Sequence, residues 1–185
     1  MALPAGPITL PPQPAPAGLQ SGHAQISLAS APNQQAPWVD LGAAIVSAPT
    51  ASLVTTAPRA LAAIAPSAGL VRYRWRGWIQ APVAGSYTLA ASINGAAADL
   101  ALRVDGIASP VVSVSRNCGL WGACPATPTT GAGSVVLSAG WHEVVVTIKT
   151  DATSRADVTI YMRAPNEAAP TVLAPSWPTG QGGAP

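Results

Sequence analysis

The residues whose types and spacing could do chemistry include two cysteines that stand close together. Cys118 and Cys124 flank five residues in NCGLWGACP, where two glycines permit a tight reversal of the chain. A disulfide is the first expectation for this pair, and it would hold Trp121 at the tip of the loop. Two free thiols are the second expectation and a metal site the third, because zinc needs two further ligands and His23 and His142 lie far away in sequence. The C-x-x-C spacing of a redox-active pair is absent.

A second candidate set is a row of arginines followed by a tryptophan. In VRYRWRGWIQ, residues 71–80, the side chains of Arg72, Arg74, Arg76 and Trp78 would project to one side, because strand side chains alternate. Such a row could stack on sugar rings or bind an acidic neighbour. The alternative, which we favour, is a solvated outer face whose arginines pair with Asp or Glu of adjacent strands. If a glycan is bound, the candidate contacts are Trp78, Trp121, Arg74 and Arg76.

Other catalytic groups are scarce. The chain carries seven Asp and Glu and two His, and 9% of its residues are charged, against about a quarter in ordinary soluble domains. No G-x-S-x-G elbow, phosphate-binding loop, dinucleotide fingerprint or H-E-x-x-H motif occurs. His142 falls in a strand pattern and is expected to face the core or a polar neighbour. The formal charge of +2 is too small to indicate a nucleic-acid partner. We therefore expect no enzyme, no cofactor and no metal.

These residues must be positioned by a middle segment that is patterned for short β-strands. Alternation or turn signals mark strands at 71–80, 86–93, 100–105, 107–115, 141–150 and 156–163. Asn-Gly at 94–95 and Asp-Gly at 105–106 are hairpin turn signals. A short helix could form only over 57–70, where two prolines limit it. The predicted fold class is all-β, an antiparallel β-sandwich of the jelly-roll type.

Composition divides the chain into three parts. Residues 1–37 and 164–185 are Pro-rich, which favours extended arms without a core of their own, and the β-sandwich domain is expected over 38–163. Flexible linkers are the simplest interpretation of both flanks. Residues 1–20 contain no Lys or Arg and proline interrupts every apolar stretch, so we expect no signal peptide of the usual kind. No window approaches the ~18 consecutive apolar residues of a membrane span.

A series of short motifs follows in order between residues 70 and 175. They are Trp75, Gly77, Pro82, Gly85-Ser86-Tyr87-Thr88, Asp105-Gly106 and Leu137-Ser138-Ala139-Gly140-Trp141-His142. In this order they resemble the protective-antigen-type domain, a lectin-like β-sandwich module of toxins, glycosidases and adhesins. The resemblance implies a module that in many members is non-catalytic and binds sugar. Some adhesin members hold calcium with paired Asp residues, but here Asp99 precedes Leu100, and Asp105 is expected to serve its turn.

Two classes of function fit this sequence. The first is a non-catalytic structural subunit of a virion, such as a phage tail, fibre or capsid decoration, or of an extracellular assembly, with Pro-rich arms contacting other protein subunits. Low charge and the arms favour this class. The alternative is a carbohydrate-binding adhesin module with cell-surface glycans as partners, which the resemblance motivates. Both classes place the protein in a virion or outside the cell, where a disulfide persists.

Overall fold

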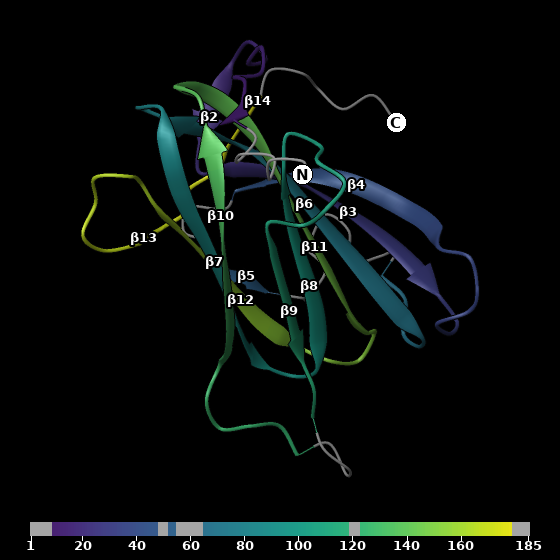
Figure 1. Ribbon diagram of the computed structural model, residues 1–185. Coiled ribbons are helices and arrows are strands. Elements are labelled where there is room, and N and C mark those ends of the chain that lie inside the picture. Colours follow the sequence, from purple (N-terminus) through teal and green to yellow (C-terminus); the bar gives the residue numbers. More distant parts are fainter. Residues whose placement is uncertain (1–8, 48–51, 55–64, 119–122, 179–185) are drawn as a thin grey trace, which may run out of the picture.

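Two β-sheets form the molecule. The computed structural model describes residues 9–47, 52–54, 65–118 and 123–178, where every regular element is a strand (Figure 1). The smaller sheet has the order β1 (Thr9–Leu10), β10 (Thr129–Leu137), β7 (Gly85–Gly95), β12 (Ala156–Arg163) and β13 (Thr171–Val172), and β5 (Ser52–Val54) also pairs with β12. The larger sheet has the order β2 (Leu19–Ser21), β14 (Ser176–Pro178), β6 (Leu70–Ala81), β11 (Gly140–Asp151), β8 (Ala98–Val104) and β9 (Val112–Arg116). In addition, β3 (His23–Ala31) pairs with β6 and β4 (Val39–Ser47) pairs with β3.

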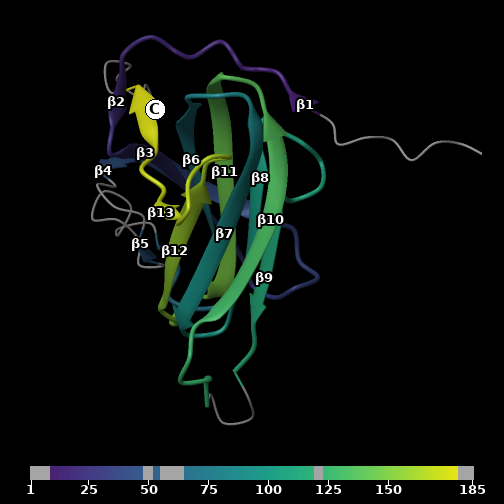
Figure 2. The same ribbon diagram turned by 60° about the vertical axis from the view of Figure 1, so that its left-hand side comes forward.

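The sheets pack face to face, with β7, β10 and β12 in front of β6, β8 and β11 in Figure 2. Only β1 with β10 is a parallel pair among the described strands. The predicted all-β antiparallel sandwich is therefore confirmed. Within the described ranges, no helix is long and apolar enough to cross a membrane.

The core lies between the sheets, where the alternate residues of each strand meet. On β6 the predicted alternation is confirmed, because Val71, Tyr73, Trp75 and Ile79 are buried and the arginines lie on the other face. Burial raises the pKa of the Tyr73 phenol above its usual value, since the phenolate would lose its solvation. The arginine row therefore lies on the outer face of the larger sheet.

One edge of the sandwich is closed by an unusually near approach of β10 to the chain leading into β9 (Figure 2). A Cβ atom added at Gly133 would stand 1.8 Å from the backbone oxygen of Val111. A Cβ atom at Gly131 would stand 2.7 Å from Cγ2 of Val114. Glycine at these two positions lets the two sheets meet at this edge.

The N-terminal segment departs from the predicted arm over 1–37. Its residues His23–Ala31 form β3, which pairs with β6 from Gln25 opposite Arg76 to Ala31 opposite Leu70. Ile26 and Leu28 of this strand are buried in the core. The expectation of an arm without a core is thus corrected for this stretch. The strand consists largely of Ala and Ser, so the alternation of apolar and polar residues is weak. The Pro-rich composition around it further obscures this alternation in the sequence.

The C-terminal segment also joins the sheets beyond residue 163. β14 pairs with β2 and meets β6 at Ser176 opposite Trp78, while Leu173 is buried. Pro175 lies where a side chain at Gly77 would stand, at 2.5 Å from the position of its Cβ atom. Of the segment predicted as a possible helix, residues 57–64 lie outside the described ranges, and 65–70 contain no helix.

Candidate functional site

A groove lies at the end of the larger sheet where β6 and β8 begin and β9 and β11 end. Its volume is about 410 Å³, and Trp38, from the connection between β3 and β4, forms its aromatic wall. Seven polar residues line it, which are Gln34, Asp99, Arg116, Asn117, Lys149, Thr150 and Asp151. A second hollow of about 480 Å³ shares Gln34, Leu70 and Asp151 with the groove, so the two adjoin. Together they make an elongated depression that offers both hydrogen-bond donors and acceptors.

Trp38 is held over two cations of the outer sheet face. Cζ of Arg72 lies 5.0 Å from the centroid of its ring and Nζ of Lys149 lies 5.9 Å away. Arg72 and Lys149 are direct cross-strand neighbours, and their like charges share the electron-rich face of one indole. Asp40 offsets part of this charge at 3.6 Å from Arg72. Trp38 is half-buried, and sequence reasoning missed it because it follows a Pro-rich stretch with no pattern of its own.

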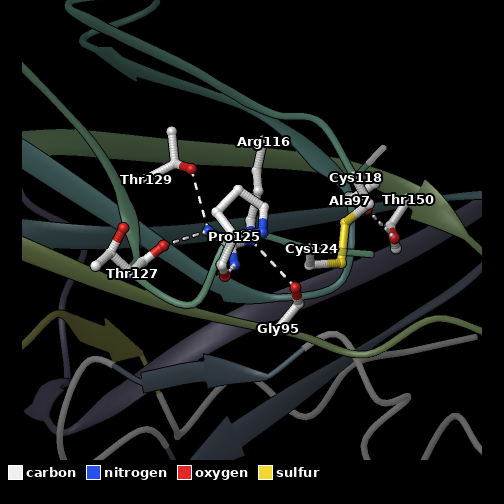
Figure 3. The surroundings of a disulfide bond; sticks show 9 residues. All are labelled: Gly95, Ala97, Arg116, Cys118, Cys124, Pro125, Thr127, Thr129 and Thr150. Atoms are coloured by element: carbon white, nitrogen blue, oxygen red, sulfur yellow. Dashed lines mark hydrogen bonds between the residues drawn. A yellow bond between two sulfur atoms is a disulfide. The ribbon is translucent and has the colours of Figure 1, made fainter. Parts of the chain in front are cut away.

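Arg116 forms the inner corner of the groove and is only 2% exposed. Figure 3 shows its guanidinium between four oxygen atoms. Nε donates to the carbonyl of Gly95 at 3.1 Å, and Nη2 donates to that of Pro125 at 2.6 Å. Nη1 donates to the carbonyl of Thr127 at 2.9 Å and to Oγ1 of Thr129 at 3.1 Å. The side chain thus joins the end of β7, the disulfide loop and the start of β10.

Asp99 of β8 also lines the groove, next to Ala98, the cross-strand neighbour of Arg116. Its Oδ1 accepts a hydrogen bond from Oγ of Ser115, its cross-strand neighbour on β9. On its other side, Asp99 stands directly opposite Lys149 of β11. The carboxylate is exposed and retains free acceptor capacity.

The two cysteines form a disulfide beside this corner, with their Cα atoms 4.2 Å apart (Figure 3). The first expectation from the sequence is therefore confirmed. Trp121, which the spacing placed at the tip of this loop, lies outside the described residues. Asn117 lines the groove directly before the first cysteine, so the bridge constrains a segment of the groove wall.

Removal of the disulfide should destabilise the domain modestly. Because the bridge spans only six positions of sequence, the Cys118→Ser/Cys124→Ser double variant should lose about 2 kcal/mol of unfolding free energy. Chemical denaturation of oxidised protein, reduced protein and double variant measures this loss. The reduced wild type should match the double variant, and equal stability of all three forms would contradict the prediction.

The arginine row occupies the outer face as predicted, and two of its members have acidic partners. Nε of Arg76 donates to Oε1 of Glu143 at 2.9 Å, and its guanidinium lies 5.6 Å from the ring of Trp177. Glu143 lies on the adjacent strand β11, whereas Asp40, the partner of Arg72, lies on β4, beyond β3. Arg74 is exposed and lines a separate hollow of about 360 Å³. Trp78 is half-buried on the same face, away from the groove lining.

A buried histidine–aspartate pair lies at the other end of β8. Nδ1 of His142 is 2.6 Å from Oδ2 of Asp105, and Nε2 is 2.9 Å from the carbonyl of Ser138. Oδ1 of Asp105 accepts the backbone N–H of Glu143 at 2.8 Å. Both side chains are inaccessible, and Ser138 takes part through its carbonyl rather than its hydroxyl. The pair is therefore structural, as expected for His142 and for Asp105 in its turn.

Comparisons with known proteins identify the architecture. No family model and no curated protein matches the chain. The A domain of epithelial adhesin 9 from Candida glabrata, solved with Galβ1-3GlcNAc, superimposes with a TM-score of 0.53 at 11% identity over 94% of this chain and 98% of that one. The PA14 domain of the antifreeze protein MpAFP gives 0.52 at 13% identity over 89% and 94%. A subtype-switched form of the adhesin, solved with β-lactose, gives 0.51 at 11% identity over 95% and 96%.

The fold is that of PA14 and lectin-like adhesin domains. At these identities the likeness concerns the architecture, which the sequence motifs over residues 70–175 also indicate. It extends beyond that range, because the matches cover 89% to 95% of the chain. The matched part therefore includes chain before residue 70.

A calcium site of the paired-Asp kind does not fit this PA14-like sandwich. Among the described residues, no three His, Cys, Asp or Glu side chains gather closely enough to hold a metal. Asp105 is only 2% exposed in its side chain and both of its oxygens are used. Calcium takes six to eight oxygens, usually with several carboxylates. Near Asp99 the groove instead presents the cations Arg116 and Lys149.

Proposed function

We propose that this chain is a carbohydrate-binding module of an adhesin, with the groove beside Trp38 as its glycan site. The observation that carries the proposal is the composition of that groove, which combines one half-buried indole with carboxylate, amide, ammonium and guanidinium groups. The apolar faces of sugar rings stack on indoles, and their hydroxyls both donate and accept hydrogen bonds. The PA14-like fold supports the proposal, since two of the similar structures were solved with bound glycans.

This proposal replaces the virion or assembly subunit as the preferred function. None of the similar structures named above is a virion protein, and two of the three are adhesin domains. None of those three is described as an enzyme, which agrees with a binding role. An adhesin module acts at the cell surface or in the extracellular medium, where the Cys118–Cys124 bridge would persist.

Three of the candidate contacts from the sequence form a second set on the outer face of β6, and the fourth lies outside the described residues. Arg74, Arg76 and Trp78 lie along β6, and Trp121 belongs to the loop beyond Cys118. Arg76 is already bound to Glu143, which leaves it fewer donors for a ligand. We therefore propose Arg74, Arg76 and Trp78 as a second contact region on β6, outside the groove, for a longer glycan.

The replacement Trp38→Ala should weaken glycan binding about tenfold, because a stacking contact of this kind is worth about 1 to 2 kcal/mol. A glycan array with wild-type protein finds the ligand, and calorimetric titration of that ligand measures the loss. Trp177→Ala is the matched control, since Trp177 also stacks on an arginine of β6 but lies outside the groove lining.

Three results of this experiment are decisive. Loss of affinity in Trp38→Ala with retention in Trp177→Ala supports the groove as the site. Unchanged affinity in Trp38→Ala with loss in Trp78→Ala moves the site to the arginine row. An array on which the wild type binds no glycan removes the proposed function.

A further inference from the structure

We propose that the groove binds an uncharged sugar without a metal ion, and that Arg116 is the built-in cation that organises it. This inference rests on the proposed function and names its ligand class. The calcium arrangement of some adhesins does not fit the side chains present, so the groove must be organised by the chain's own groups. Arg116 is the group whose contacts match that task.

The contacts of Arg116 resemble those of an oxygen-bound cation. Its four hydrogen bonds end on three backbone carbonyls and one hydroxyl, all of them neutral. The acceptors come from two segments, the end of β7 at Gly95 and the stretch 125–129 that leads into β10. A bound calcium ion holds chain segments together through their oxygen atoms, and a cation that bonds to carbonyl oxygens of separate segments has the same structural role. A guanidinium performs it permanently, because it does not lose its proton in proteins.

The charge around Arg116 also opposes a divalent ion. No carboxylate is among its hydrogen-bond partners in the described part of the chain, so its positive charge is not neutralised by direct contact. Lys149 adds a second cation to the same groove. A divalent ion beside the buried guanidinium of Arg116 would be repelled by its positive charge in a region of reduced solvation. Arg116 therefore makes the groove unsuitable for calcium as well as independent of it.

The ionisable side chains that line the groove balance one another. Arg116 and Lys149 carry positive charge, and Asp99 and Asp151 carry negative charge. The groove therefore has no excess of positive charge to attract a sialylated or sulfated glycan, whereas an uncharged sugar can bond to the exposed Asp99, Lys149 and Asp151 through its hydroxyls. Of the five N–H donors of Arg116, four have acceptors among the described residues. These bonds hold the corner of the groove in place, so Arg116 acts as a positioning residue.

The first test compares binding and stability of the wild type in excess EDTA and in excess calcium chloride. We expect the same glycans to be retained on an array in both solutions, uncharged ones among them. We also expect the same melting temperature in both. A calcium site filled at a hundredfold excess over its dissociation constant would raise the melting temperature by about 5 to 10 °C.

The outcomes separate this inference from the function on which it rests. Binding that appears only with calcium, or a calcium-dependent rise in melting temperature, overturns metal-free recognition and leaves the adhesin function standing. Retention of sialylated or sulfated glycans alone overturns the uncharged ligand class. No glycan binding in either solution overturns the proposed function, and this inference with it.

The second test assigns the role to Arg116. Arg116→Lys keeps the charge but replaces the planar fork by a single ammonium, so it cannot reach all four acceptors. We expect about a tenfold or greater loss of glycan affinity, measured by titration below the melting temperature of the variant. Arg163→Lys, an exposed arginine of β12, is the matched control and should bind like wild type. A folded Arg116→Lys with lower melting temperature but unchanged affinity would overturn its role as a positioning residue for the ligand.

Discussion

Replacing Asp105 by Ala should lower the free energy of unfolding by about 4 kcal/mol. The carboxylate is buried together with the imidazole of His142, and the side chains are 2% and 0% exposed. Both ring nitrogens of His142 lie within hydrogen-bond distance of oxygen atoms, of Asp105 and of Ser138. Without Asp105 this ring and the N–H of Glu143 lose their acceptor inside the protein. Thermal and chemical denaturation should show the loss, with a melting temperature about 10 °C lower.

The matched variant is Asp105→Asn, which should lose about half as much. Asparagine tolerates the left-handed backbone at this position, where φ is 48°. Its amide oxygen can accept the N–H of Glu143, and its NH₂ group can donate to a neutral His142 that still donates through Nε2 to Ser138. If Asp105→Ala proved as stable as Asp105→Asn, the pair would not support the fold as we argue.

Replacing Gly133 by Ala should cost about 3 kcal/mol or more, because the added methyl group has no space. Its position is 1.8 Å from the carbonyl oxygen of Val111 and 2.9 Å from the carbonyl carbon. Val111 cannot give way easily, since its N–H donates to the carbonyl of Leu102 on β8 at 2.8 Å. The strain should separate β9 from β10, which faster amide exchange at Val112 and Val114 would reveal.

Gly106→Ala is the control for this prediction. At Gly106 there is open space around the added Cβ atom, but φ is +69°, so the cost should be only the roughly 1 kcal/mol of a left-handed backbone. Chemical denaturation of both variants gives the comparison. A loss for Gly133→Ala no larger than for Gly106→Ala would show that the two sheets do not meet at this edge as described.

Both replacements act away from the groove, so stability and ligand binding should be separable in this domain. Asp105 and Gly133 are absent from the groove lining. The groove lining comes from the opposite end of β8 to the Asp105 turn. Variants of Asp105 should therefore keep the glycan affinity of wild type at temperatures where they remain folded.

The strands that could be predicted from the sequence are those with a complete local pattern. Residues 71–80 alternate strictly, and the structure has β6 over Leu70–Ala81 with its apolar side inward. Asp-Gly at 105–106 predicts a turn from the sequence, and the structure has a turn at these residues. Residues 23–31 escaped prediction because Ala and Ser give only a weak contrast between the two faces, and pairing with β6 decides their conformation.

The candidate site was predicted in part, for a similar reason. The spacing of Cys118 and Cys124 indicated the disulfide, since a short loop brings its own ends together. Arg116, two positions earlier, gave no signal, because its acceptors at Gly95 and Thr129 are 21 and 13 positions away. Trp38 likewise becomes part of a site only through Arg72 and Lys149.

By itself the sequence determined the all-β class, the inward face of β6, the disulfide and the scarcity of groups for catalysis, since each depends on neighbouring residues or on composition. Only the tertiary structure decided which charged side chains are buried and which groups they contact. It buried His142 against Asp105 at a separation of 37 positions, surrounded Arg116 with oxygens and set Trp38 over two cations. The physical reason is that a strand's pattern is local, whereas the partner of a charged side chain is set by sheet pairing between distant segments.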